Sequence, residues 1–313
     1  MKIFRICCPI CFTLAFFSIL LTSYSTVQSG NKSDGPTYIK DCPDCPELIV
    51  IPAGSFTMGS PETEEGRDPG EIQHHVTISK SFALGKNPVT KEEFKLFVSS
   101  TGYNAHGKCF GMDAQGNGEE SERYTWETPG FNQTDEEPVT CVNALDAEAY
   151  ASWLSKKTGK TYRLPTEAEY EYAARAGTTS SRYWGESQDE GCSYANGNGY
   201  ESETVFWGKM TNCNDGFIYT SPVGSYRPNA FGLNDMLGNV WVWMADCWHD
   251  SYAGAPDNES AWLEQSCSAR VMRGGSFISN YTSIRAAARH KAETEKRFHN
   301  YGIRIARDIT TED

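Results

Sequence analysis

The alternation of hydrophobic and polar positions predicts strands at the start of the chain. Residues 48–51 form an apolar run of strand length, and residues 75–79 alternate as a half-buried strand does. Residues 52–59 read as a turn that leads into a further strand, and residues 61–71 form a charged loop. The first part of the fold is therefore expected to be β structure.

Three helices are predicted from their caps. Thr90 with Glu93 and Thr166 with Glu169 have the spacing of capping boxes, in which each side chain accepts a hydrogen bond from a free backbone N–H. Asn143 has the chemistry to cap a third helix. The expected ends of the helices are glycines, at Gly102, Gly159 and Gly177.

Residues 177–308 have no comparable helical period and are rich in Gly, Asn, Ser and aromatic side chains. We expect short strands around residues 223–226, 240–244, 271–277, 284–288 and 301–306. Few helices, short strands and long loops predict an α+β fold with little regular secondary structure, three clear helices and several short strands.

The N-terminus resembles an export signal. Lys2 and Arg5 precede an apolar stretch at residues 10–21, and small or polar residues follow as far as Gly30. The apolar stretch is short for a membrane span, so we expect residues 1–30 to be a signal peptide, with an uncleaved N-terminal anchor as the alternative. We therefore expect an exported protein, periplasmic or secreted, or lumenal in a eukaryote, with no transmembrane domain after signal removal. Residues 31–47 read as a linker, 48–308 as one domain and 309–313 as a tail.

Composition limits the possible partners. The formal net charge is −13, and an acidic chain repels phosphate backbones, so nucleic-acid binding is not expected. Hydrophobic residues make up 39% of the chain, which is enough for a sizeable core. A monomer that binds a protein or small-molecule ligand fits this composition.

Cysteine usage agrees with export. Of the 11 cysteines, those outside the predicted signal are even in number, which favours disulfides. Pairing of neighbours is the simplest arrangement, although the sequence leaves other pairings open. The motif at residues 42–45, Cys-Pro-Asp-Cys, is read as a structural clip, with a thioredoxin-like redox pair as the alternative. The neighbour pairs are Cys42–Cys45, Cys109–Cys141, Cys192–Cys213 and Cys247–Cys267.

Several motifs in order resemble the formylglycine-generating enzyme family, also called sulfatase-modifying factors. They are IPAGSFTMGS at 51–60, PVT at 88–90, RLPTEAEYEYAARAG at 163–177, FGLNDMLGNVWVW at 231–243, RGGSF at 273–277 and YGIRIARD at 301–308. The similarity covers residues 47–308. It implies a variant of the C-type lectin fold with bound calcium.

The resemblance implies one calcium site with a suitable ligand set. The family pattern falls on Asn196, the Gly197 carbonyl, Asp215 and the Phe217 carbonyl. Amide, carboxylate and carbonyl oxygens are hard ligands of the kind that Ca²⁺ prefers.

A second calcium site is in doubt because one ligand position has changed. Its pattern falls on Asp235, the carbonyls of Gly238 and Val240, and position 242. The family typically has Glu at the last position, and this chain has Val242, whose hydrocarbon side chain offers no oxygen.

The catalytic centre departs furthest from the family. Formylglycine-generating enzymes oxidise a substrate cysteine with O₂ and Cu(I), which two cysteine thiolates hold as soft ligands. The equivalent positions here are Ser279 and about Ile284, and no cysteine follows Cys267. Copper binding of the family's kind is therefore not expected.

Other polar residues are candidates for this pocket. Ser276 and Asn300 match polar positions near the family's pocket, and Ser279, at a position of the copper cysteines, is a further candidate. His290 and His299 lie close to these motifs in sequence. A histidine there would serve as acid or base, or be purely structural. The arginines of the same region have two interpretations, as an anion site or as buried partners of acidic side chains: Arg285, Arg289 and Arg304.

Two functions of different classes follow. The first is a binding or accessory module that lacks the copper cysteines. The second is an oxidative maturation enzyme without copper–cysteine chemistry, like the pyoverdine-maturation relatives of the family. Conventional formylglycine generation on sulfatases is a third, less favoured alternative, since it needs a different copper site.

Overall fold

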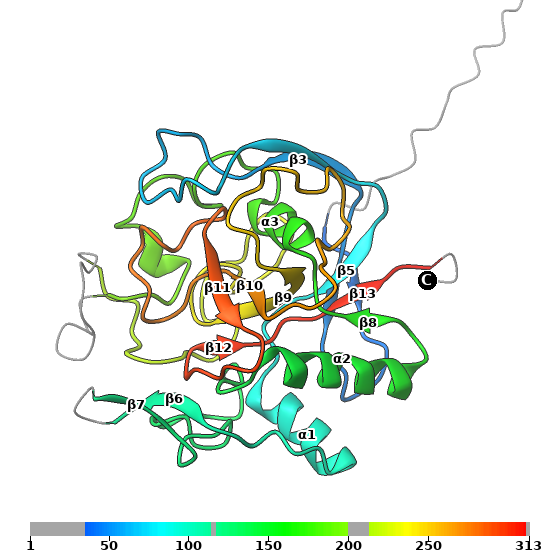
Figure 1. Cartoon of the computed structure of the whole chain (residues 1–313), viewed down its shortest axis with the longest axis vertical. Helices are drawn as coiled ribbons and strands as arrows, with labels where there is room; N and C mark the ends of the chain where they lie inside the picture. The colour runs from blue at the N-terminus through cyan, green and yellow to red at the C-terminus, as the bar shows by residue number, and fades with distance from the viewer. Residues whose placement is uncertain (1–34, 114–116, 200–212, 311–313) are drawn as a thin grey trace, which may run out of the picture. The chain divides into compact units, whose positions relative to one another are not determined.

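The first of two main sheets joins the two ends of the domain. The computed structural model describes residues 35–113, 117–199 and 213–310. Five strands pair in the order β1-β2-β5-β13-β8, all antiparallel (Figure 1). C-terminal β13 lies between β5 and β8, so the YGIRIARD segment ends inside this sheet. The strands are β1 (Tyr38–Ile39), β2 (Leu48–Ile51), β5 (Phe82–Gly85), β8 (Tyr162–Arg163) and β13 (Ala306–Asp308).

The second sheet carries the motifs of the C-terminal half. Four strands pair in the order β11-β10-β9-β12, antiparallel except for the parallel pair β9 and β12. Its strands are β9 (Trp241–Cys247), β10 (Ala269–Arg273), β11 (Arg289–Glu293) and β12 (Tyr301–Gly302). Two separate hairpins complete the described β structure, β3 (Gly54–Met58) with β4 (His74–Ile78) and β6 (Cys109–Met112) with β7 (Gly118–Ser121).

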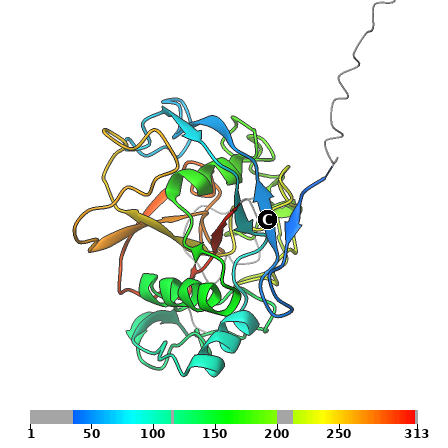
Figure 2. The same ribbon diagram turned by 90° about the vertical axis from the view of Figure 1, so that its right-hand side faces the viewer.

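Three α-helices in the described residues begin at the predicted caps. They are α1 (Lys91–Thr101), α2 (Ala144–Thr158) and α3 (Glu167–Arg175). Each has a complete capping box, and in α2 the partner of Asn143 is Asp146. Helix α3 lies against β3, β9 and β10, whereas α2 packs on α1 and β8 (Figures 1 and 2). A 3₁₀ turn, η1, spans Gly191–Ser193.

Two predicted strands are wrong. Residues 284–288 form turns, in which the Ile284 N–H donates to the Asn280 carbonyl, and the strand begins only at Arg289. Residues 223–226 also form a turn, closed by the Ser225 N–H on the Pro222 carbonyl. Ile284 is fully buried in that turn. The apolar residues at 284–288 therefore indicated that this segment is buried, but they did not indicate an extended backbone.

Buried ion pairs connect α3 to the second sheet. Arg175 bonds Glu171, Glu171 pairs with Arg273, and Arg273 lies 3.7 Å from Glu167, which in turn contacts Arg289 at 2.6 Å. All residues of α3 are buried. Charges removed from water need partners of opposite sign, so this alternating chain fixes how α3 meets β10 and β11.

The four disulfides of the neighbour pairing are all present: Cys42–Cys45, Cys109–Cys141, Cys192–Cys213 and Cys247–Cys267. The first lies within the predicted linker, where β1 already pairs with β2, and the compact unit spans Pro36–Asp313. The predicted signal, residues 1–30, lies outside the described residues. Within the described part of the chain, no helix has the length and apolar character needed to cross a membrane.

Candidate functional site

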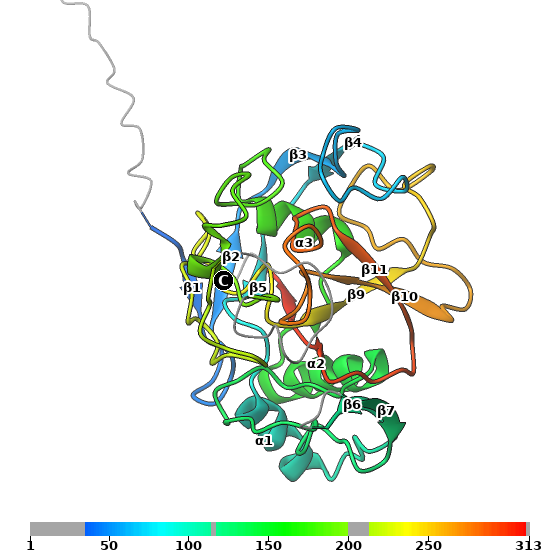
Figure 3. The ribbon, with the colours of Figure 1, turned by 90° about the vertical axis from the view of Figure 1, so that its left-hand side faces the viewer.

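The turn after β10 brings together three of the predicted pocket residues. Gly274 and Gly275 have φ of 102° and 80°, a left-handed backbone that favours glycine. Beyond the turn, the Ser276 and Ser279 hydroxyl oxygens lie 3.2 Å apart. The Asn300 amide donates to the Ser276 Oγ at 3.0 Å. Strand β12 starts directly after Asn300 (Figure 1), so both sides of this site are anchored in the second sheet, whose strands β9, β10 and β11 are labelled in Figure 3.

One polar atom of this site lacks a partner. The Asn300 side chain is 4% exposed, and its Oδ1 is buried without a hydrogen bond. A buried acceptor left unpaired costs about 1–3 kcal/mol, so such an atom marks a place where a donor can bind favourably. The site can thus accept a hydrogen bond from an N–H or O–H group.

The predicted histidines do not join this cluster. His290 stacks on Trp241, with ring centroids 5.2 Å apart, and its Nε2 lies 2.7 Å from the Tyr301 hydroxyl. Burial lowers the pKa of His290. His299 is 1% exposed, and burial lowers its pKa to about 4, so the ring is neutral at pH 7.

His299 belongs to an aromatic cluster that the sequence did not predict. Its ring centroid is 5.6 Å from that of Phe277 and 6.4 Å from that of Phe131, which stacks on Tyr219 at 4.5 Å. The ring places Nδ1 3.0 Å from the Phe110 carbonyl, while Nε2 is buried without a partner. These rings come from four distant segments, and spacing along the chain carries no signal for such a cluster.

The residues of the first predicted calcium site lie together. Asp215 accepts hydrogen bonds from the Gly197 N–H at 2.8 Å and the Phe217 N–H at 3.0 Å. Asn196 is fully buried, and its Oδ1 has no hydrogen-bond partner. Its Nδ2 donates to the Tyr219 carbonyl, which turns Oδ1 away from that contact. The Gly197 carbonyl accepts from the Gly199 N–H at 2.8 Å. The unpaired Asn196 oxygen and the Asp215 carboxylate are hard ligands of the kind that a calcium ion prefers.

The second predicted calcium site fits less well. Asp235 is 3% exposed and has one carboxylate oxygen without a partner, while the other accepts from the Gly224 N–H at 2.7 Å. The Gly238 carbonyl accepts from the Val240 N–H. Val242 is 1% exposed and packs in the hydrophobic core around α3. The Asp235 carboxylate can still serve as a ligand. Position 242, where the family typically has Glu, instead belongs to the hydrophobic core.

The three arginines are structural. Arg285 bonds Glu64 and Glu71, and Arg289 bonds Glu167. Arg304 instead donates to the backbone carbonyls of Gly85, Lys86, Asn234 and Asp235. The interpretation as buried acid partners therefore holds for Arg285 and Arg289, and Arg304 satisfies carbonyl groups.

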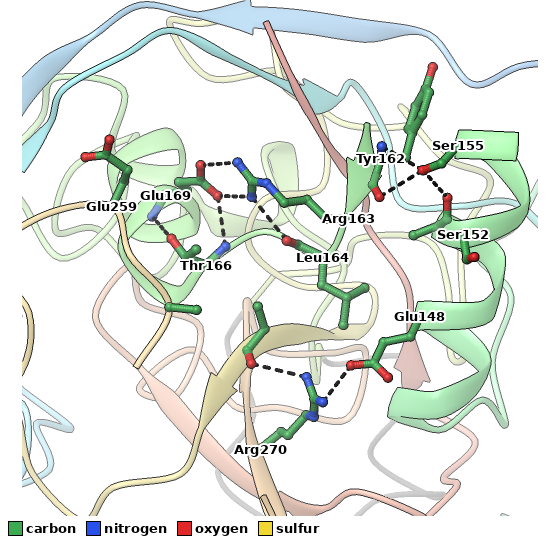
Figure 4. A pocket seen from close by; sticks show the side chains of 13 residues that line it. Glu148, Ser152, Ser155, Tyr162, Arg163, Leu164, Thr166, Glu169, Glu259 and Arg270 are labelled. Carbon is green, nitrogen blue, oxygen red and sulfur yellow. Dashed lines mark hydrogen bonds and ion pairs between the residues drawn. The ribbon is translucent and has the colours of Figure 1, made fainter. Parts of the chain in front are cut away.

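A separate surface groove of about 580 Å³ lies between α2, β8 and the start of α3 (Figure 4). Its charged groups bond one another: Arg163 holds Glu169 with two bonds of 2.7 Å, and Arg270 lies 2.6 Å from Glu148. These pairs occupy most of the groups that would fix a ligand. The Ser276–Asn300 site is the better candidate because its unpaired acceptor is buried.

Comparison with known proteins agrees with the motifs. The model of the sulfatase-modifying factor enzyme 1-like domain matches residues 36–309. The chain belongs to the sulfatase-modifying factor family. The formylglycine-generating enzyme of Streptomyces coelicolor is 32% identical over 83% of this chain and 88% of that protein.

Family members of other kinds are also similar. The inactive Cα-formylglycine-generating enzyme 2 of Bos taurus is 31% identical over 81% of this chain and 82% of its own length. The structure of PvdO from Pseudomonas aeruginosa superposes with a TM-score of 0.76 and 40% identity, covering 89% of this chain and all of that one. The predicted α+β, C-type lectin-like fold of the sulfatase-modifying factors is therefore confirmed.

Proposed function

We propose that this protein is an exported, copper-independent sulfatase-modifying factor that binds a protein or small-molecule ligand at the Ser276–Asn300 site. One observation carries the proposal: every cysteine among the described residues is in a disulfide. Cu(I) needs thiolate ligands of the kind that the family supplies, and the positions implied for them hold Ser279 and Ile284.

The chemistry of the site supports binding. Ser276 and Ser279 offer hydroxyl groups, and the Asn300 Oδ1 offers a buried, unpaired acceptor. A donor group of the ligand would replace the missing hydrogen bond, and the surrounding buried backbone would hold it with little reorganisation. Among the described residues of this region, His299 has a strongly lowered pKa, and its ring packs on the aromatic ring of Phe277. It therefore does not form an acid–base pair with the serines.

We further propose that calcium is a structural cofactor at Asn196, Gly197, Asp215 and Phe217. The unpaired Asn196 Oδ1 and the Asp215 carboxylate support this ligand set. The ion would hold two chain segments together and would supply charge compensation for Asp215, with no part in a reaction.

One assay tests the copper-free function. Calcium-loaded protein is incubated with Cu(I), O₂ and a peptide that carries the Cys-x-Pro-x-Arg motif of sulfatases, and the peptide is analysed by mass spectrometry. The expected result is an unchanged thiol, because every cysteine among the described residues is in a disulfide and has no thiolate to hold copper. Conversion of the thiol to an aldehyde by this protein would overturn the proposal.

The second candidate, a maturation enzyme without copper cysteines, is favoured by the 40% identity to PvdO over nearly the whole chain. Oxygen uptake by the purified protein, with a metabolite extract of the producing cells as substrate source, separates the two. Uptake that disappears in Asn300→Ala would favour the enzyme, and binding of a metabolite from the same extract without uptake would favour the binding module.

A further inference from the structure

The proposed calcium ligands lie on two chain segments that a disulfide closes into a loop. Asn196 follows Cys192 by four positions, and Asp215 follows Cys213 by two. The Cys192–Cys213 bond spans 21 positions, with its Cα atoms 6.0 Å apart. A covalent bond thus joins the two halves of the site close to their proposed ligands.

Hydrogen bonds also connect the two halves. Asp215 accepts from the Gly197 N–H, and the Asn196 Nδ2 donates to the Tyr219 carbonyl at 2.8 Å. Without the disulfide, only non-covalent contacts would hold the two segments, and an ion would have to order them further as it binds. The covalent bond restricts the two segments before an ion binds.

The cysteine residues of this bond are less buried than those of the Cys109–Cys141 bond. Cys192 and Cys213 are both half-buried, whereas Cys109 and Cys141 are each 0% exposed. Thiol–disulfide exchange requires a reductant to reach one sulfur, so the two bonds differ in access.

We propose that the Cys192–Cys213 disulfide sets the calcium affinity of the Asn196–Asp215 site and makes that affinity sensitive to redox conditions. A dithiol reductant gives two electrons and two protons to the bond and becomes a disulfide itself, and Cys192 and Cys213 become thiols. The reduced protein then binds calcium more weakly. This inference rests on the calcium binding proposed above.

The Ser276–Asn300 site contacts the segment whose order depends on the Cys192–Cys213 disulfide. The Asn198 N–H donates to the Ser279 carbonyl at 2.9 Å, and the Tyr281 hydroxyl donates to the Ala195 carbonyl at 3.0 Å. The same Tyr281 hydroxyl is 3.7 Å from the Cys192 sulfur. The turn that carries Ser276 and Ser279 therefore rests on the segment that carries Asn196, and loosening one affects the other.

The test compares calcium affinities by isothermal titration of the full chain after removal of metal with a chelator. The double variant Cys192→Ser/Cys213→Ser is expected to bind calcium at least about tenfold more weakly than the native chain. The matched control, Cys42→Ser/Cys45→Ser, removes a disulfide away from the site and is expected to keep the native affinity.

Circular dichroism without calcium shows whether the variants are folded. If Cys192→Ser/Cys213→Ser does not fold, the native protein is titrated after mild reduction, with alkylation and mass spectrometry to identify which sulfurs were reduced. A folded variant, or selectively reduced protein, whose calcium affinity stays within about twofold of native would overturn the inference while leaving the calcium proposal standing.

Absence of calcium binding by the native chain would overturn the calcium proposal and this inference together. It would leave the copper-free function untouched, because the peptide assay tests that function separately.

Discussion

Single buried side chains with unpaired atoms determine what the candidate sites can do. Asn196 and Asn300 each have a buried side-chain oxygen without a hydrogen-bond partner. The Nε2 atom of His299 is also buried without a partner. The resemblance to the family predicted both asparagines as site residues. The surroundings of His299 depend on rings from distant segments, and no pattern along the chain predicts such contacts.

His299 should make the protein sensitive to acid. Its folded pKa of about 4 lies below the ordinary value of 6.5, so the unfolded chain takes up a proton that the folded chain does not. The stability that the folded chain gains from the neutral His299 ring is fully present above about pH 6.5. It is lost as the pH falls toward 4, which lowers the free energy of unfolding by about 3 kcal/mol. Urea unfolding of the native protein and of His299→Asn across this range measures it.

Asn replaces the Nδ1 donor to the Phe110 carbonyl but does not titrate. The difference between the two stability profiles should therefore narrow as the pH falls. Asp246 has the opposite sign, because its burial raises its pKa to about 7, but it is common to both proteins and cancels in the difference. Parallel profiles would contradict this account of His299.

Asp215 should decide calcium binding. Asp215→Asn removes the one carboxylate of the proposed site while leaving an oxygen for the Gly197 or Phe217 N–H. Calcium at about 100 times its Kd is expected to stabilise the native chain by about 2.7 kcal/mol and Asp215→Asn by much less. Thermal unfolding with calcium and with a chelator measures both, and equal stabilisation would remove Asp215 from the ligand set.

At the scale of elements, local signals predicted the helices better than the strands. The caps Thr90, Asn143 and Thr166 act within one turn of chain, so their positions can be read directly. Strand pairing is non-local: β13 enters the first sheet between β5 and β8, and β12 runs parallel to β9. The error at residues 284–288 has the same cause, since burial of Ile284 came from packing and not from a ladder.

The cap of α3 should contribute measurably to stability. The Thr166 hydroxyl oxygen accepts from the Glu169 N–H at 3.1 Å, and the Glu169 carboxylate accepts from the Thr166 N–H at 2.9 Å. Thr166→Ala is expected to lower the free energy of unfolding by about 1 kcal/mol, and Thr166→Ser should restore most of it. Chemical denaturation compares the three proteins. An unchanged midpoint in Thr166→Ala would show that the ion pairs of α3 alone position the helix.

Across the whole molecule, covalent links join segments that the sheets leave apart. Cys109–Cys141 spans 32 positions and is completely buried, whereas Cys42–Cys45 spans only 3. Neighbour pairing predicted these bonds, although the eight cysteines alone allowed many other arrangements. The family motifs predicted the fold because they mark the strand ends and turns that recur in it.

Loss of these two bonds should have unequal effects. Replacing both Cys109 and Cys141 by Ala is expected to cost about 4 kcal/mol, and the same change at Cys42 and Cys45 about 2 kcal/mol, because a longer loop gains more entropy when it opens. Thermal unfolding of the two double variants measures the order. A larger loss for Cys42→Ala/Cys45→Ala would contradict the loop-length argument.

We propose that this sulfatase-modifying factor has the family fold without a copper site. Titration of the calcium-loaded, fully oxidised protein with Cu(I), in competition with a chromogenic Cu(I) chelator, tests it most directly. We expect the chelator to keep the copper, since every described cysteine is in a disulfide and Ser279 and Ile284 offer no thiolate. Withdrawal of one equivalent of Cu(I) from the chelator by the native protein would contradict it.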